Sequence, residues 1–384
     1  MGFGGAGSGK TVRPARRALL EEGDLPVAPG DQGGELGPEV AVDLDMGGVA
    51  LGGPQEARAQ REQAAVRWFV AAVEEVPAEG SDLQGALSIR VLKRDFLTGE
   101  ELGAFELRSL LARAAELKAG RKSGEGADSL ARSSVGLYFG RPSTRTRISF
   151  EVGVAELGAT PVILRGDELQ LARGESVGDT GRVLSRFLDA LVVRSGSHAE
   201  VVELAGAAAV PVVNGLTSVH HPCQALADLL TLKERFGELD GLRIAYVGDG
   251  NNVARSLAIL GTLADVEVVI AAPEGYQLDE PHGARLTDDP RDAVSGADAV
   301  YTDVWISMGD EQEAERRRAD LAPFRIDSDL LAAAGGRAIV LHCLPAHPGE
   351  EITEEVLYGP RSAVWDQAEN RLHAQKALLE LLLR

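Results

Sequence analysis

Aromatic residues, cysteines and long apolar runs are all scarce in this sequence. Only 4% of its 384 residues are aromatic although 44% are hydrophobic, so its cores must be built mainly from aliphatic side chains. Two cysteines, Cys223 and Cys343, cannot form a disulfide framework, which favours the reducing cytoplasm. No apolar stretch reaches the roughly 18 residues of a membrane-spanning helix, so no membrane span is predicted. We expect a cytoplasmic globular protein with room for two domains.

Positive charge is also deficient. Lysine and arginine total 39 against 59 aspartates and glutamates, which gives a formal net charge of −20. Such a field disfavours nucleic acid or an anionic membrane as a lasting partner. Any anionic small molecule would have to be held by a local cluster of arginines that overcomes this field.

Residues 1–90 lack the composition of a folded domain. No lysine or arginine occurs between Glu21 and Gln55, where glycine, proline and acidic residues prevail. Such a segment buries too little apolar surface to offset the entropy lost on ordering, so we expect residues 1–90 to be mostly disordered. The exception is a helical pattern around Trp68 and Phe69, two candidate docking residues.

The same segment contains "GGAGSGKT", Gly4 to Thr11, which fits the phosphate-binding P-loop pattern G-x-x-x-x-G-K-[ST]. A P-loop needs a buried strand before it and a helix after it, because helix N–H groups bind the phosphate. Only three residues precede the motif, and Pro14 follows it closely. We therefore interpret it as part of a glycine-rich chain start and not as a nucleotide site.

From about Val91 onward, helix and strand patterns alternate. Helices are expected over 106–120, 145–159, 177–188, 198–208 and 222–237, strands over 134–139, 160–165, 189–195, 210–215, 266–272, 298–305 and 338–345, and a strand followed by a helix over 242–264. Alternating strands and helices indicate parallel sheets covered by helices on both faces. We expect two doubly wound parallel-sheet α/β domains joined by long helices, the second of them Rossmann-like.

"FGRPSTRTR" follows the predicted strand 134–139 and opens the predicted helix 145–159. The motif puts hydroxyl groups and guanidinium groups where helix N–H groups are unpaired, at Ser143, Thr144, Arg145, Thr146 and Arg147. Together these donors are typical of an anion-binding site. The alternative is an exposed basic turn with ordinary serine and threonine capping.

"HHPCQ" opens the long helix predicted over 222–237, with Pro222 in its first turn. His221 and Gln224 are three residues apart and should share a face directed at the strand ends of the first domain. An imidazole there could polarise a carbonyl group, and an amide could recognise an NH₂ group. The alternative is a histidine that serves only as a cap or as a satisfied polar residue.

Two further motifs follow predicted parallel strands, at the edge where open α/β sheets bind ligands. "DVWISMG" begins at Asp303, and "HCLP" spans His342 to Pro345. Asp303 and the Ser307 hydroxyl could hold an ammonium group, although an aspartate after a strand is often only a cap. The histidines and cysteines show no C-x₂-C or H-x₃-H spacing, so we expect no metal.

"YVGDGNNVARS" is close to the dinucleotide-binding fingerprint but departs from it. Gly248 and Gly250 end a predicted strand, whereas Val253 occupies the position of the third glycine. We interpret the motif as a tight strand-to-helix turn in a Rossmann-like domain.

Together, "STRTR", "HPCQ", "DVWISMG" and "HCLP" resemble the motifs of the ornithine carbamoyltransferase family, in the same order and spacing. "VNGLT", "YVGDGNN" and "WDQAENRLHAQKALL" fit the same family, and the resemblance covers roughly residues 91–384. The first two motifs are shared with aspartate carbamoyltransferase. The chain departs from the family at Gly140 and Arg141, where an acidic–basic pair is frequent, and at Pro348, where bacterial members often carry arginine.

The resemblance implies a reaction and a set of domains. Carbamoyl phosphate and L-ornithine would give L-citrulline and phosphate, in a homotrimer with shared active sites and without metal or organic cofactor. The expected domains are an extension over 1–90, a carbamoyl-phosphate-binding domain over 91–228, an ornithine-binding domain over 229–365, and a C-terminal helix over 366–384 that packs back on the first domain.

The resemblance also implies the site residues. Carbamoyl phosphate would contact Ser143, Thr144, Arg145, Thr146, Gln170, Arg194, His221, Gln224, Cys343, Leu344 and Arg371, with Gln170 reaching the phosphate site of a neighbouring subunit. Ornithine would contact Asn214, Asp303, Ser307 and Met308. The residues implied in catalysis are Arg194, His221, Asp303 and Cys343. Two alternatives stay open, namely a transferase for another amine such as putrescine, lysine, acetylornithine or aspartate, and a non-catalytic relative in a regulatory complex.

Overall fold

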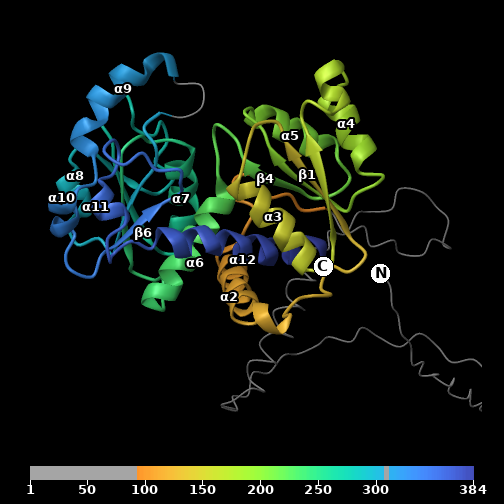
Figure 1. Cartoon of the computed structure of the whole chain (residues 1–384), viewed down its shortest axis with the longest axis horizontal. Helices are drawn as coiled ribbons and strands as arrows, with labels where there is room; N and C mark the ends of the chain where they lie inside the picture. The colour runs from red at the N-terminus through yellow and green to blue at the C-terminus, as the bar shows by residue number, and fades with distance from the viewer. Residues whose placement is uncertain (1–92, 307–310) are drawn as a thin grey trace, which may run out of the picture. The chain divides into compact units, whose positions relative to one another are not determined.

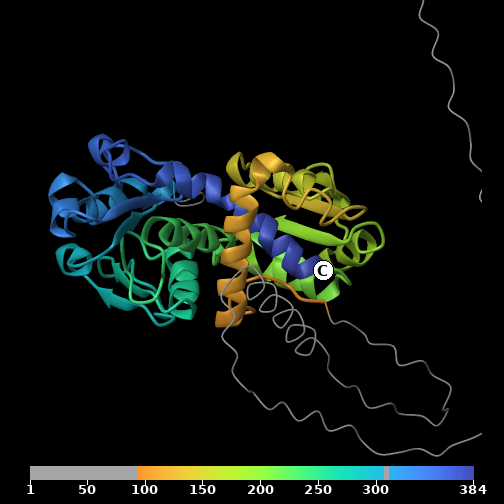
Figure 2. The same cartoon turned by 90° about the horizontal axis from the view of Figure 1, so that it is seen from below.

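The computed structural model describes residues 93–306 and 311–384. The disorder and helix expected within residues 1–90, the P-loop motif, and the predicted ligands Ser307 and Met308 lie outside the described residues. Figures 1 and 2 show the described part from two directions, with two sheets and a long C-terminal helix that runs between them.

The first sheet is four-stranded and entirely parallel. Its strand order is β2-β1-β3-β4, with β1 at Ser134–Phe139, β2 at Thr160–Arg165, β3 at Ala190–Arg194 and β4 at Val212–Leu216. The helices between the strands are α3 (Arg145–Glu156), α4 (Val177–Leu184) and α5 (His198–Ala207). β3 is apolar and almost continuously buried, as expected of a parallel strand covered on both faces.

The second sheet is five-stranded and also parallel. Its strand order is β7-β6-β5-β8-β9, with β5 at Arg243–Val247, β6 at Glu267–Ala271, β7 at Arg285–Thr287, β8 at Ala299–Thr302 and β9 at Ile339–His342. Its helices are α7 (Asn252–Leu263), α8 (Pro290–Val294), α9 (Ala314–Leu321), α10 (Ser328–Ala333) and α11 (Glu354–Leu357). Short 3-10 turns lie at Arg121–Ser123, Gln170–Arg173, Glu311–Glu313 and Ala322–Phe324. β6 and β7 are added on one side of β5, whereas β8 and β9 are added on the other side. Doubly wound sheets open a ligand crevice where the strand order switches in this way, here between β5 and β8.

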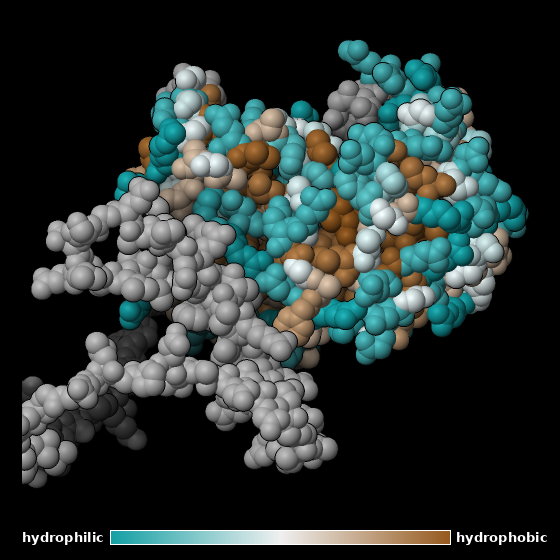
Figure 3. Space-filling view, turned by 180° about the vertical axis from the view of Figure 1, so that it is seen from behind, coloured by the Kyte–Doolittle hydropathy of each residue, from teal (hydrophilic) through white to brown (hydrophobic). Residues whose placement is uncertain are grey.

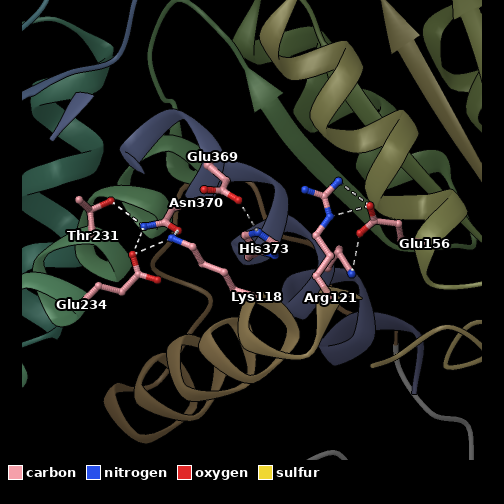
Figure 4. Close-up of polar contacts among 9 residues, drawn as sticks. Lys118, Arg121, Glu156, Thr231, Glu234, Glu369, Asn370 and His373 are labelled. Carbon is pink, nitrogen blue, oxygen red and sulfur yellow. Dashed lines mark hydrogen bonds and ion pairs between the residues drawn. The ribbon is translucent and has the colours of Figure 1, made fainter. Parts of the chain in front are cut away.

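Three long helices join the two halves. α6 (Pro222–Phe236) leads from the first sheet to the second, and α12 (Val364–Leu383) returns and packs against α6, α3 and α2 (Ala104–Ala119) (Figure 1). Polar side chains also connect them, because Lys118 of α2 donates to Glu234 of α6 and to Asn370 of α12 (Figure 4). The fold class expected from the sequence, two parallel α/β sheets joined by long helices, is confirmed.

Some element boundaries differ from those expected. The helix predicted over 177–188 ends at Leu184, because Ser185 caps it and Phe187 emerges into solvent. The helix predicted over 145–159 ends at Glu156, and Gly158 takes the positive φ of 81° that reverses the chain there. β7, with three residues, and α8, with five, were not anticipated, since elements this short carry no readable periodicity.

The surface is mostly hydrophilic. On the face drawn in Figure 3, hydrophilic side chains cover most of the molecule and apolar residues lie in patches between them. Among the described residues, no helix combines the length and the apolar composition that a membrane crossing requires.

Candidate active site

A cavity of about 680 Å³ lies at the carboxyl ends of strands from both sheets. Its wall contains ten of the residues implied in the site, namely Ser143, Thr144, Arg145, Thr146, Arg194, His221, Asp303, Cys343, Leu344 and Arg371. These residues come from the turn after β1, the ends of β3, β8 and β9, the start of α6, and α12. Segments far apart in the sequence are therefore brought to one place.

The start of α3 forms one end of this cavity. Thr144 is the N-cap of α3 and makes no capping hydrogen bond with its side chain, so its hydroxyl is not used by the helix. Thr146 is almost fully buried, and its hydroxyl oxygen accepts from Arg194 Nη1 at 3.1 Å and from Arg371 Nη2 at 2.5 Å. One threonine thus ties two guanidinium groups to a helix N-terminus, a combination suited to an anion.

The arginines at this end have little to neutralise them. Burial, and then the nearby charges of Arg371 and Arg145, lower the pKa of Arg194 to about 10. Burial also lowers the pKa of Arg371. In the described part of the chain, no hydrogen-bond partner reaches the buried Nε atoms of Arg194 and Arg371. Cations this close together that lack a counterion among the described residues favour the binding of an anion.

His221 lies beside the arginines, at the N-cap of α6. Its backbone N–H donates to Ser256 Oγ at 2.7 Å, and its side chain is 3% exposed. Burial holds the pKa of His221 well below the usual value, and Arg371 and Arg194 add to this effect. The imidazole is therefore neutral at pH 7, with an Nδ1 atom that finds no partner among the described residues.

Asp303 and Cys343 form an acidic part of the cavity wall. The Cys343 thiol donates to Asp303 Oδ1 at 2.7 Å, and Asn251 Nδ2 donates to Asp303 Oδ2 at 2.8 Å. Burial, then the charge of Asp303, raise the pKa of the Cys343 thiol well above its usual value, so the sulfur stays protonated. The cavity wall thus offers a carboxylate whose two oxygens are held by Cys343 and Asn251.

The turn after β9 is held by a buried histidine. His342 Nδ1 accepts from the backbone N–H of Leu344 at 2.9 Å, so the ring proton must be on Nε2, which lies 3.1 Å from Glu351 Oε1. Leu344 has a φ of 59°, which is rare for a side chain larger than glycine. The hydrogen bond from its N–H secures this conformation beside the cavity.

Three of the implied ligands do not line this cavity. Gln224 is buried behind the wall, where its Nε2 donates to Asp228 Oδ1 at 2.9 Å and its Oε1 is unpartnered. Asn214 is buried, and its Nδ2 donates to the Leu97 carbonyl at 2.8 Å. Gln170 begins a short 3-10 turn beside a second cavity of about 360 Å³.

Several wall residues were missed by sequence reasoning, which treated "YVGDGNN" only as a tight turn. Asp249, Asn251, Asn252, Thr217 and Arg317 all line the cavity. Asn251 caps α7 by accepting from the N–H groups of Val253 and Ala254, and its amide NH₂ reaches Asp303. An asparagine in the turn between a parallel strand and the next helix was the available signal.

Two groups of side chains in the described residues have donor atoms close enough for a metal. The first group is Asp303, His342 and Cys343. Both ring nitrogens of His342 already form hydrogen bonds, with Leu344 and Glu351, and the Cys343 thiol donates a hydrogen bond to Asp303. In the second, His347, Glu350 and Glu351, each carboxylate keeps one oxygen without a partner while the other is engaged.

Comparison with known proteins gives the family. Residues 94–234 match the model of the aspartate/ornithine carbamoyltransferase carbamoyl-P binding domain, and residues 240–382 match that of the Asp/Orn binding domain. A protein named ornithine carbamoyltransferase from Symbiobacterium thermophilum is 51% identical over 303 residues, covering 76% of this chain and 98% of that protein. Another from Pyrococcus furiosus, named as anabolic, is 47% identical over 303 residues, covering 76% and 96%.

Solved structures agree. Ornithine carbamoyltransferase from Pyrococcus furiosus superimposes with a TM-score of 0.73 at 47% identity, covering 76% of this chain and 97% of that one. The enzyme from Thermus thermophilus gives a TM-score of 0.70 at 44% identity, covering 76% and 99%. The family's two domain models match both halves of the chain, and the matches cover almost the whole length of the relatives. This chain therefore belongs to the aspartate/ornithine carbamoyltransferase family.

Proposed function

We propose that this protein transfers the carbamoyl group of carbamoyl phosphate to the δ-amine of L-ornithine, giving L-citrulline and phosphate. The observation that carries the proposal is the polarity of the cavity. Two arginines, whose buried Nε atoms find no partner among the described residues, and the Asp303 carboxylate line the same cavity. A dianionic phosphate would bind at the arginines and an ammonium group at the carboxylate.

The phosphate would bind at the start of α3. Ser143, Thr144, Arg145 and Thr146 would donate hydroxyl, guanidinium and backbone N–H groups to it, and Arg371 would add charge from α12. Arg194 and the neutral His221 would donate to the carbamoyl oxygen as charge develops there, and a preorganised donor of this kind contributes roughly 3–4 kcal/mol. Gln224 would receive the carbamoyl NH₂ on its amide oxygen. Phosphate leaves readily, so this reaction requires neither a covalent intermediate nor a metal.

Ornithine would bind at Asp303, which would hold an ammonium group together with Ser307, while Asn214 and the Met308 backbone would lie near the carboxylate. Cys343 would lie beside ornithine, and Cys343 and Leu344 would also contact carbamoyl phosphate. A free δ-ammonium titrates near pH 10.4, so producing the neutral amine at pH 7 costs roughly 4–5 kcal/mol. Holding the two substrates side by side offsets part of that cost.

The oligomeric state, the cellular location and the metabolic role are further parts of the proposal. We propose a homotrimer in which Gln170, carried on the polar segment "ELQLARGES", reaches the phosphate site of the neighbouring subunit. A cytoplasmic location fits the two unpaired cysteines. A role in arginine biosynthesis fits the Pyrococcus furiosus relative that is named anabolic.

Citrulline formation from carbamoyl phosphate with a panel of amines tests the proposal. Ornithine, putrescine, lysine, acetylornithine and aspartate would be compared at equal concentration. We expect product with ornithine alone. Product from another amine in preference to ornithine would assign the chain to a different carbamoyl transfer, and absence of product with every amine would indicate a non-catalytic relative.

A further inference from the structure

A buried carboxylate behind the cavity wall joins two side-chain amides. Asp228, on α6, is fully buried. Its Oδ1 accepts from Gln224 Nε2 at 2.9 Å and from Gln367 Nε2 at 2.7 Å. Its Oδ2 has no hydrogen-bond partner in the part of the chain that the structure describes.

Each amide is oriented by this contact. Because Oδ1 accepts from both Nε2 atoms, both glutamines turn their NH₂ groups toward Asp228 and their oxygens away from it. The Gln367 oxygen accepts from the backbone N–H of His342 at 2.8 Å, directly before Cys343. Among the described residues, no donor reaches the buried Gln224 oxygen, which lies one helical turn from His221. A buried acceptor of this kind is suited to a donor supplied by a ligand.

The connection therefore spans both sides of the cavity. Gln224 belongs to α6, which carries His221, whereas Gln367 belongs to α12 and fixes the strand end that carries Cys343 and its contact to Asp303. We infer that Asp228 is a positioning residue that couples the start of α6, which carries His221, to the end of β9, which carries Cys343 and its contact to Asp303, through the amides of Gln224 and Gln367. This inference rests on the proposed function and adds a residue to it.

The charge of Asp228 is not what the geometry requires. Both contacts end on the single oxygen Oδ1, and an asparagine can present the same acceptor oxygen to both amides. Its NH₂ group would then occupy the place of Oδ2. Burial raises the pKa of Asp228 to about 7, so the protein already tolerates a carboxyl that is partly neutral at this position.

The test compares Asp228→Ala, Asp228→Asn and a control on the same helix. Thr231→Ala is matched because Thr231 is also buried on α6 but does not line the cavity. Its hydroxyl donates to the Ala227 carbonyl and accepts from Asn370 Nδ2 (Figure 4). Wild-type citrulline formation from ornithine is measured first, because its absence would refute the proposed function and not this inference. KM for each substrate, kcat and Tm are then measured for every variant.

We expect folded Asp228→Ala to lose on the order of 10²-fold in kcat/KM, with a raised KM for carbamoyl phosphate, because the two amides are free to turn. Asp228→Asn should retain most of the wild-type kcat/KM. Thr231→Ala should show near wild-type kinetics whatever its Tm. Wild-type constants in folded Asp228→Ala would overturn the inference. Equal loss in Asp228→Asn and Asp228→Ala would overturn it too, because charge and not acceptor geometry would then be at work.

Gln367→Leu keeps the inference testable should Asp228→Ala fail to fold. This change removes the contact to the His342 N–H and leaves the Gln224 contact in place. We expect its KM for ornithine to rise more than its KM for carbamoyl phosphate, since the affected strand end carries Cys343. An ornithine KM equal to that of the wild type would contradict the coupling.

Discussion

The Cys343 thiol donates to Asp303 Oδ1 across 2.7 Å, and the two residues follow neighbouring parallel strands of the second sheet, β9 and β8. Because burial and the charge of Asp303 keep this thiol protonated, the pair carries one negative charge, on the carboxylate. An incoming ammonium group would therefore meet an oriented carboxylate whose second oxygen is held by Asn251.

Asp303→Asn should lower kcat/KM for ornithine on the order of 10²-fold. The amide keeps the shape but removes the charge that holds an ammonium group, and its NH₂ would face the Asn251 donor. Asp298→Asn is the matched control, because Asp298 is also buried but lies at the opposite end of β8, where it accepts from the Arg243 N–H. An Asp303→Asn enzyme with full activity would remove Asp303 from the amine site.

Arg145→Ala should abolish most activity by weakening the binding of carbamoyl phosphate. A guanidinium group at a helix N-terminus can bind phosphate through two hydrogen bonds, which neither water nor lysine reproduces. Arg147→Ala is the control, since Arg147 lies on the same helix but pairs with Glu151 outside the cavity. The KM for carbamoyl phosphate of both variants is the measurement, and equal values would show that the start of α3 is not the phosphate site.

His373 on α12 should make the protein less stable in acid. Its ring is fully buried, with Glu369 Oε1 3.7 Å from Nε2 and with Lys118 and Arg121 nearby (Figure 4). Burial outweighs the opposing charge of Glu369 and lowers the pKa of His373 to about 4. A histidine in the unfolded chain binds its proton near pH 6.5. Between pH 6.5 and pH 4 the unfolded state therefore binds more protons than the folded state, and the free energy of unfolding decreases as the pH is lowered. The loss from pH 7 to pH 4 amounts to about 3 kcal/mol.

Denaturant unfolding at pH 7, 5.5 and 4 checks this prediction. His373→Gln should show a flatter dependence on pH, whereas His347→Gln, at an exposed position, should match the wild type. Parallel curves for His373→Gln and wild type would show that His373 does not contribute to acid destabilisation.

Removal of residues 1–90 should leave citrulline formation intact. Every described residue of the cavity wall lies between Arg141 and Arg371, and the family match begins at residue 94. The measurement is the kcat of the truncated chain, together with an assay of ATP hydrolysis by the full chain. ATP hydrolysis that is lost in Lys10→Ala would restore the P-loop interpretation of "GGAGSGKT".

The sequence was most informative where a motif and a strand end coincide. "STRTR" after β1 and "HCLP" after β9 predicted wall residues by position, because parallel strands deliver their carboxyl ends to one edge. Roles that depend on contacts across the chain were not readable. Nothing near Asp228 in the sequence indicates that Gln367 shares its oxygen, and nothing near Asn251 indicates that Asp303 lies within 2.8 Å of its amide.

The central claim is tested most directly by the ratio of kcat/KM for ornithine to that for aspartate, measured with the wild-type enzyme and carbamoyl phosphate. Asp303 would repel an additional carboxylate and leave it unpaired, and discrimination of this kind reaches on the order of 10⁴ or more. The rate with ornithine should also rise from pH 7 toward alkaline pH, as more neutral δ-amine becomes available. A strong preference for ornithine is the predicted result, and comparable turnover of aspartate would contradict the account.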